Sequence, residues 1–211
     1  MKTAFNSIPI VILFSFIGTT VMAQEFTLKD RSVLELNMGL WGQSGASSTT
    51  NAFGTKAEAR TSAFVGGILY AYGVQEEIAV TLSAGILSAQ ASSNIGAQGI
   101  NQQGSVVMPF LIGVRYYVPT PEPGAKVRPF ISLAAGSYIG MQGSNTVLLQ
   151  ESETESAFGG RVGLGIDIYV SNYFKLVANA GYNFMSDFST PIGSRSNYNG
   201  GEMSFGVGYA F

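Results

Sequence analysis

Apolar residues recur at every second position in eight separate segments of this chain, and this alternation constrains its fold more than any other feature. Successive side chains of a β-strand leave opposite faces, so alternation over nine or more residues predicts a strand with one apolar face. In residues 158–170, for example, Leu164 and Ile166 stand opposite Gly163 and Asp167. The predicted strands span residues 33–41, 61–74, 78–86, 105–118, 128–141, 158–170, 174–184 and 201–211. We therefore expect an all-β fold.

The connections between the predicted strands alternate between two lengths. The long ones are rich in Ser, Asn, Gln, Thr and Gly and span 42–60, 88–104, 142–157 and 186–200. The short ones span 74–77, 119–127 and 170–173. Long loops at one end and short turns at the other describe an antiparallel up-and-down meander. Crossing a bilayer takes roughly 9 to 11 residues of tilted strand, so the sequence predicts an eight-stranded transmembrane β-barrel.

The first residues differ from the rest of the chain. Lys2 precedes an apolar run at 8–17, and Val21 and Ala23 stand three and one residues before a cleavage site. This arrangement is typical of a secretory signal peptide, and the run is too short to span a bilayer as a helix. We predict a signal peptide at 1–23 and a single β-barrel domain at 24–211.

The composition also favours a membrane protein. Only 11% of the residues are charged and the mean hydropathy is +0.24, whereas an average soluble domain has roughly 25% charged residues. Removing residues 1–23 takes Lys2 from the 11 basic residues and leaves 10 against 13 acidic ones. This slight negative charge indicates no nucleic-acid partner. The chain has no cysteine, so backbone pairing and packing must hold the fold without disulfides.

Five charged residues fall on the polar faces of the predicted strands. They are Glu35, Arg115, Arg161, Asp167 and Lys175. Buried charges are costly unless paired, and an eight-stranded barrel is only just wide enough for its side chains. We expect these residues to form a lumen charge network that plugs the barrel, with Arg161 above the other four. The functional alternative is a narrow, charge-lined path for small solutes.

The segment 201–211 alternates to its end and finishes on Phe211. In a closed barrel the last strand pairs with the first, and Phe211 would lie in the aromatic girdle at the periplasmic interface. Four motifs combine aromatic and apolar residues with small or polar ones. They are GVRYYVP at 113–119, RPFISLAAGSY at 128–138, AGYNF at 180–184 and the terminal GVGYAF. With these motifs the chain resembles the small outer-membrane β-barrels of Gram-negative bacteria, the porin-family or OmpA/OmpX-like barrels.

The resemblance implies an integral outer-membrane protein that contacts outer-membrane lipid. It also implies recognition by the barrel-assembly machinery through a C-terminal signal formed here by Phe205, Tyr209 and Phe211. Two functions remain open: a structural barrel with at most minor permeation of small solutes, and a surface adhesin or ligand-binding barrel acting through its extracellular loops. A soluble, lipocalin-like barrel is disfavoured, because its outward faces would carry Gly, Ala and Asn with few charges.

Nothing in the sequence indicates an enzyme. The outer-membrane enzymes that this family includes rely on a histidine, and this chain has none. A Ser-Lys dyad needs a lysine in an enclosed site, and the predicted strand 174–184 that carries Lys175 has no serine. We expect no cofactor.

Four further features have structural and functional interpretations. The glycines of GGRVGLG at 159–165 fit neither nucleotide-binding fingerprint, and the acidic stretch at 151–155 lacks the spacing of a calcium loop. We therefore expect no metal site.

The apolar TVLL at 146–149 indicates either a hairpin that extends above the membrane or a buried turn within its loop. Trp41 lies near a strand end, and both a lumen and a girdle position are open.

Overall fold

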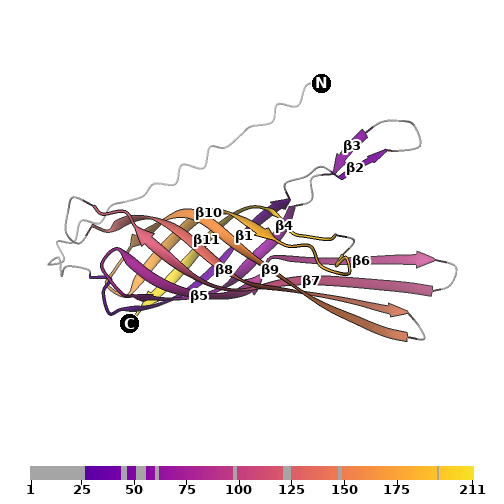
Figure 1. The fold of residues 1–211 in the computed structure, drawn as a ribbon, viewed down its shortest axis with the longest axis horizontal. Helices are drawn as coiled ribbons and strands as arrows, with labels where there is room; N and C mark the ends of the chain where they lie inside the picture. Colours follow the sequence, from indigo (N-terminus) through magenta and orange to yellow (C-terminus); the bar gives the residue numbers. More distant parts are fainter. Residues whose placement is uncertain are drawn as a thin grey trace, which may run out of the picture.

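Hydrogen-bonded neighbours form a closed ring of antiparallel strands in the computed structural model (Figure 1). The structure describes residues 27–43, 47–50, 56–59, 62–96, 99–120, 125–146, 149–193 and 195–211. Within these ranges, no helix combines the length and the apolar character that crossing a membrane requires.

Eight of the described strands follow one another around the barrel. Their order is β5 (Ile78–Ile86), β4 (Ser62–Gly73), β1 (Ser32–Gln43), β11 (Gly200–Ala210), β10 (Phe174–Met185), β9 (Leu149–Tyr169), β8 (Val127–Thr146) and β7 (Gly99–Tyr117). Pairing between β7 and β5 closes the ring. Each strand overlaps a segment in which alternation predicted one, so the predicted eight-stranded antiparallel barrel is confirmed.

The barrel wall is irregular where β5 gives way to β6 (Ser88–Gly96). The ladder between β5 and β7 ends at Ala84, opposite Phe110, and the ladder between β6 and β7 begins at Ser88, opposite Val107. Residues 85–87 therefore lie opposite only Met108 and Pro109. Three residues against two form a β-bulge, and a proline has no N–H to donate to the ladder. The strands β5 and β6 are thus two parts of one bent strand.

Two of the predicted long loops are largely strand, which corrects the expectation for 88–104 and 142–157. The β6–β7 ladder runs to Gly96 opposite Gly99, and the β8–β9 ladder runs to Thr146 opposite Leu149. Figure 1 shows both hairpins extending past one end of the barrel. The pattern did not predict them, because a strand without one apolar face has no period-two signal. We call β6 and the paired ends of β7, β8 and β9 the projecting sheet.

The projecting sheet bears on the TVLL motif at 146–149, which falls at the tip of the β8–β9 hairpin. The flanking Thr146 and Leu149 are paired strand residues, which agrees with a hairpin that extends past the barrel, whereas residues 147–148 lie outside the described part. A smaller hairpin formed by β2 (Ser47–Thr50) and β3 (Lys56–Ala59) lies within the predicted loop 42–60 and forms a separate sheet.

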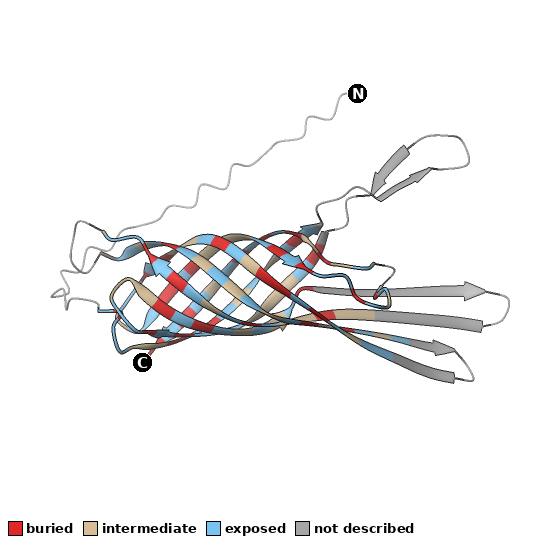
Figure 2. Ribbon diagram, viewed as in Figure 1, coloured by how far each residue is buried: buried red, intermediate tan, exposed pale blue. Residues whose placement is uncertain are grey.

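Burial alternates along each strand of the barrel (Figure 2). The outward side chains are apolar, whereas the inward ones are charged, polar or small, with large apolar side chains toward the two ends of the lumen. Leu36, Ile112 and Leu164 are 55%, 66% and 66% exposed, whereas Glu35 and Asp167 are fully buried. A soluble barrel shows the reverse arrangement, because water favours polar outer faces. The lipocalin-like alternative is therefore wrong, and the assigned faces are those of a membrane barrel.

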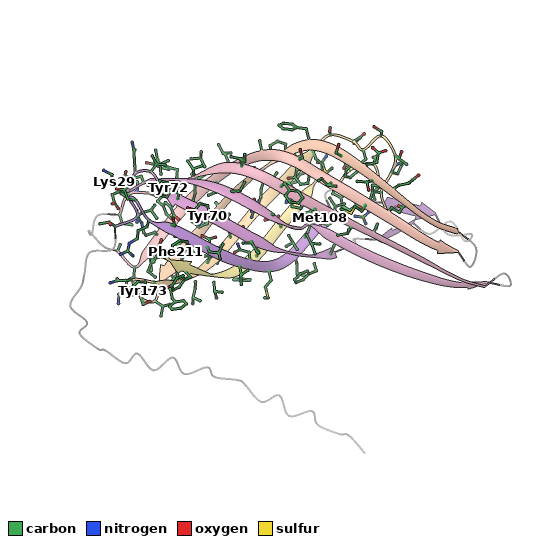
Figure 3. The ribbon with its side chains drawn as sticks, turned by 90° about the horizontal axis from the view of Figure 1, so that it is seen from below. Lys29, Tyr70, Tyr72, Met108, Tyr173 and Phe211 are labelled. Atoms are coloured by element: carbon green, nitrogen blue, oxygen red, sulfur yellow. The ribbon has the colours of Figure 1, made fainter. Side chains whose placement is uncertain are left out.

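The C-terminal residue closes the ring at the short-turn end. Ser32 and Phe211 exchange two backbone hydrogen bonds, at 3.1 and 2.9 Å. Tyr209 stacks on Phe211 at 6.2 Å between ring centroids and on Tyr173 at 6.3 Å. Figure 3 shows Tyr70, Tyr173 and Phe211 gathered at this end of the barrel. The outward aromatic rings form the girdle that such barrels carry at a membrane interface.

Candidate functional site: the barrel lumen

Four charged side chains meet inside the barrel toward its short-turn end. Strand β1 contributes Glu35, β7 contributes Arg115, β9 contributes Asp167 and β10 contributes Lys175. All four residues are at most 3% exposed. Inward positions of four strands thus converge on one point, because a barrel this narrow brings its inner faces within side-chain reach. We call these residues the lower charge cluster.

Each cation of the lower charge cluster contacts both carboxylates. Arg115 donates to Glu35 through Nη1 at 2.6 Å and through Nη2 at 3.0 Å, and its Nη1 lies 3.5 Å from Asp167. The Lys175 Nζ lies 2.5 Å from one oxygen of each carboxylate. Two-pronged pairing between Arg and Glu fixes orientation as well as charge. Two cations and two carboxylates cancel, so this layer is neutral.

Aromatic side chains pack around the lower charge cluster. The Tyr117 hydroxyl donates to Asp167 Oδ2 at 2.8 Å, and the Arg115 guanidinium carbon lies 4.1 Å from the centroid of the Phe130 ring. The surrounding apolar layer closes the short-turn end and comprises Leu28, Val33, Ala71, Ala79, Tyr117, Phe130, Tyr169, Val177 and Ala210. Leu28 precedes the first strand, and its backbone N–H donates to the Glu76 carboxylate at 3.0 Å.

A second ion pair lies higher in the lumen, between Arg161 of β9 and Glu202 of β11. Arg161 also donates to Asn179 at 2.5 Å, and Asn183 donates to Glu202 at 2.6 Å. The sequence analysis did not assign Glu202 to the lumen, although it shares the parity of the inward-facing Ser204. Glu202 lies two residues before Ser204 on the same strand, so alternation along β11 predicts that it faces inward. With Glu202, three basic and three acidic side chains balance inside the barrel.

A cavity separates the lower charge cluster from the hairpin end of the barrel. Its water-accessible volume is about 80 Å³. Its polar lining includes Asn37, Thr81, Ser83, Ser132, Asn179 and Ser204. Three buried atoms of its lining have no hydrogen-bond partner within the described protein, namely Asn37 Oδ1, Arg115 Nε and Arg161 Nε. A water molecule needs about 10–15 Å³ of such volume, so the cavity has room for several.

The segment from 186 to 199, part of the long polar connection predicted at 186–200, folds over the hairpin end of the lumen. Phe188, Ile192 and Tyr198 are buried, at 4%, 0% and 1% exposure. They pack with barrel side chains that include Trp41 and Tyr138. The other members of this layer are Ala63, Leu87, Val107, Leu111, Ala157 and Met185. The sequence analysis did not predict this packing, because these three apolar residues occur singly and produce no periodic pattern.

Trp41 lies at the centre of this upper apolar layer, in the lumen rather than the girdle. Its ring lies 5.7 Å from the Tyr198 ring, and the Arg195 guanidinium lies 5.7 Å from each ring centroid. Burial raises the pKa of the Tyr198 hydroxyl above its usual value, although nearby Arg195 opposes this shift. The upper layer therefore combines apolar packing with a cation held over aromatic faces.

The structure separates the residues that the sequence grouped as one network. Glu35, Arg115, Asp167 and Lys175 form one cluster, whereas Arg161 pairs with Glu202 elsewhere. The C-terminal residues Phe205, Tyr209 and Phe211 point outward and are 64%, 46% and 63% exposed. In the acidic stretch Glu153 is exposed. Within the described residues no group of three or more His, Cys, Asp or Glu side chains is placed to hold a metal ion.

Comparison with known proteins agrees with this architecture. Residues 11–211 match the family described as "Outer membrane protein beta-barrel domain". No curated protein matches the chain. Among solved structures, Neisserial surface protein A aligns with a TM-score of 0.54 at 15% identity, over 87% of this chain and 98% of that one.

Two further barrels align similarly. The outer membrane protein OprG from Pseudomonas aeruginosa gives a TM-score of 0.53 at 12% identity, over 88% of this chain and 97% of that one. Ail, the attachment invasion locus protein of Yersinia pestis, gives a TM-score of 0.53 at 13% identity, over 87% of this chain and 99% of that one. At such identities these structures show the fold alone. The match over residues 11–211 shows more: this chain belongs to the outer membrane protein beta-barrel family and is a protein of the bacterial outer membrane.

Proposed function

We propose that this protein is a non-enzymatic, structural barrel of the outer membrane whose blocked lumen allows at most slow permeation of small solutes. The lower charge cluster is the observation that carries the proposal. An ion-selective pore presents charge of one sign along its path, whereas Arg115 and Lys175 each contact both Glu35 and Asp167. Apolar layers on both sides of the cluster add to the block.

The lumen also lacks the groups that the known outer-membrane chemistries would need. A Ser-Lys dyad needs a lysine that faces a serine, but the Lys175 ammonium faces two carboxylates at 2.5 Å. The sequence contains no histidine, which is the usual base in such sites. Both observations support a non-enzymatic protein.

Single-channel recording in a planar lipid bilayer tests the blocked lumen. We expect the unmutated protein to give no steady conductance above the bilayer baseline, and brief, small openings at most. The matched variant is Arg115→Met with Glu35→Gln, which leaves Lys175 paired with Asp167 and removes the largest side chain of the cluster. A large, steady current through the unmutated protein would contradict the proposal and favour a true pore.

A second candidate function, attachment to an external partner, is favoured by the projecting sheet. Its β6–β7 and β8–β9 hairpins rise past the barrel and expose strand edges (Figure 1), and such edges pair readily with added strands. Ail, a neighbour in fold, was solved with the heparin analogue sucrose octasulfate. Here, however, residues 88–104 and 142–157 carry three acidic and no basic side chains, which favours an uncharged or basic partner over a polyanion.

Cells that display the full chain, or a variant in which residues 143–153 are replaced by a two-residue turn, would test attachment. Adhesion to surfaces coated with an acidic, a neutral or a basic protein is measured, with sucrose octasulfate as competitor. Adhesion lost with the hairpin and unaffected by the competitor supports this candidate. Equal adhesion of both strains, with equal amounts of folded barrel, would contradict it.

We also propose that Phe205, Tyr209 and Phe211 form the signal for barrel assembly. All three rings project outward from β11, where another protein reaches them before the ring closes. Deleting Phe211 should lower the amount of heat-modifiable, folded barrel in the outer membrane while export across the inner membrane continues. Equal folded amounts of the variant and parent would contradict this role.

A further inference from the structure

The cavity in the middle of the lumen lies between two layers of different chemistry. Below it lies the lower charge cluster, and above it lies the apolar layer that includes Trp41, Phe188, Ile192 and Tyr198. Buried polar atoms without protein partners are normally satisfied by water. The cavity is therefore a chamber with room for water and with polar side chains among its apolar lining. Its function depends on which of its two ends opens.

The lower end resists opening because every route through it separates buried charges. Arg115 and Lys175 each contact both carboxylates, and all four residues sit on strands that are paired on both sides. Separating such a pair leaves buried charges uncompensated, which is strongly unfavourable. Moving the cluster would also require moving the barrel wall.

The upper end is closed partly by a segment that is outside the barrel sheet. Its described backbone bonds are largely internal, such as Phe188 N–H to Ser196 at 2.7 Å and the two bonds between Ile192 and Arg195. Toward the barrel, one backbone bond joins the Ser186 N–H to the Phe158 carbonyl at 2.9 Å. The Gly193 N–H donates to the Gln142 side chain at 2.7 Å, and the Asn199 side chain accepts from the Met185 N–H at 2.6 Å. Apolar contacts add to this attachment. Segments with few backbone bonds to the rest of a protein open at the lowest free energy.

We propose that the chamber is a binding site for small, uncharged polar solutes, and that residues 186–193 and 195–199 form its lid on the extracellular side. By the topology of such barrels, the short turns face the periplasm and the lid faces the exterior. The residues that line the chamber carry two donors without protein partners, Arg115 Nε and Arg161 Nε, and one such acceptor, Asn37 Oδ1. Because each charge already has a partner, the site favours hydrogen bonding over net charge.

This inference rests on the proposed blocked lumen, but the two are tested apart. Access to the chamber is measured by chemical modification, whereas passage through the barrel is measured by current. A conducting barrel would contradict the proposed function even with a closed lid, and a permanently closed chamber would contradict only the lid.

The sequence supplies two clean probes for the test. It has no cysteine and a single tryptophan, and Trp41 lies under the lid against Tyr198. A cysteine at Ser83, which lines the chamber, is nearly isosteric with the native residue. Its reaction with the small uncharged reagent methyl methanethiosulfonate reports entry, and acrylamide quenching of Trp41 reports the lid. A cysteine at the exposed Ser156 gives the reference rate.

Gly140→Leu is the variant that displaces the lid. A Cβ at Gly140 would lie 2.8 Å from Ile192 Cγ1 and 3.0 Å from Phe188 Cζ. Gly201→Leu is its matched control near the same end of the barrel, because a Cβ there comes within 4 Å of a single atom, at 3.9 Å. Ile192→Ala loosens the lid without adding volume and serves if Gly140→Leu does not fold.

We expect the cysteine at Ser83 to react with methyl methanethiosulfonate at least about tenfold more slowly than the cysteine at Ser156. Gly140→Leu should raise the reaction rate at Ser83 about tenfold. Quenching of Trp41 rises in parallel, and Gly201→Leu changes neither. For each reagent, the reaction rate at Ser83 is divided by its rate at Ser156. This ratio should be smaller for the anionic reagent 2-sulfonatoethyl methanethiosulfonate than for the uncharged one.

Three results would overturn the proposal. The first is a Ser83 cysteine that reacts as fast as the reference in the unmutated background, because the chamber would then have no lid. The second is a rate that stays unchanged in folded Gly140→Leu and in Ile192→Ala. The third is equal entry of the anionic and uncharged reagents, which would contradict the preference for uncharged solutes.

Discussion

The two ends of the lumen are closed by different interactions. At the periplasmic end, Glu35, Arg115, Asp167 and Lys175 pair across the barrel from strands that are fixed in the wall. At the extracellular end, apolar side chains from a connecting segment pack against Trp41 and its neighbours. The lower charge cluster is thus formed by residues of the barrel strands, whereas the upper apolar layer depends on a segment that packs onto the barrel from outside the sheet.

This difference predicts how each closure responds to damage. Ion pairs in a low-dielectric interior are interdependent, since removing one partner leaves another charge buried and unpaired. Apolar contacts lose free energy in proportion to the atoms removed. Single substitutions should therefore be severe in the lower charge cluster and graded in the upper layer.

The largest effect is expected for Arg115→Met. The substitution leaves Glu35 and Asp167 with Lys175 as their one cation in the lower charge cluster, and a buried charge left without its partner costs about 3–5 kcal/mol. Urea unfolding of the protein in lipid vesicles should show a loss of this size. The companion variant Arg115→Met with Glu35→Gln keeps the layer neutral and should be less destabilised than Arg115→Met alone. Additive losses would show that the pair is not coupled.

The next largest effect is expected on the lipid-facing side of the barrel. The charge pairs that close the lumen lie inside the barrel, and a charge on its outer face should not be tolerated. Leu164 is 66% exposed on the outside of β9, and an arginine at the bilayer midplane of such a barrel costs about 2–4 kcal/mol. We expect Leu164→Arg to show this loss on refolding into vesicles. Val170→Arg, at the short-turn rim, is the matched control and should cost less than about 1 kcal/mol. Reversed severities would mean that the faces are inverted.

The wall was predictable because membrane burial imposes a strict chemical rule on each strand position. Residues such as Leu164 and Asp167 could be assigned to opposite faces by parity alone, and their exposure follows that assignment. The projecting sheet obeys no such rule. Most positions in the extensions of β7, β8 and β9 are polar or glycine, so the sequence contains no apolar alternation to detect there.

The two ends of the lumen differ in predictability for the same reason. The lower charge cluster lies on strands, so parity placed Glu35, Arg115 and Lys175 on the inner face before any contact was known. The upper layer depends on Phe188 and Ile192, which lie in an irregular segment where position along the chain does not determine direction. Long-range packing decides their burial, and a local pattern carries no information about it.

The third prediction concerns Glu202→Gln, which tests a charge pair between the two closures. Arg161 is 20% exposed at its side chain and borders the chamber, so water compensates part of the lost pairing. We expect a loss of about 1–2 kcal/mol, between the values typical of exposed and buried ion pairs. The same urea unfolding measurement applies, and Glu35→Gln in the lower charge cluster is the control that should cost more. Equal losses would mean that the chamber is dry.

The smallest effect is expected for Ile192→Val in the upper layer. Removing one buried methylene from isoleucine typically costs about 0.5–1.5 kcal/mol, and here the loss should appear in the local opening of the lid, because this segment is attached to the barrel largely through side chains. Acrylamide quenching of Trp41 should then rise about two- to tenfold, while the urea midpoint of the barrel barely changes. A midpoint that falls by the full amount, with quenching unchanged, would show that the segment unfolds only with the barrel. In that case the upper closure would be as integral to the wall as the lower charge cluster, and the contrast between the two ends would fail.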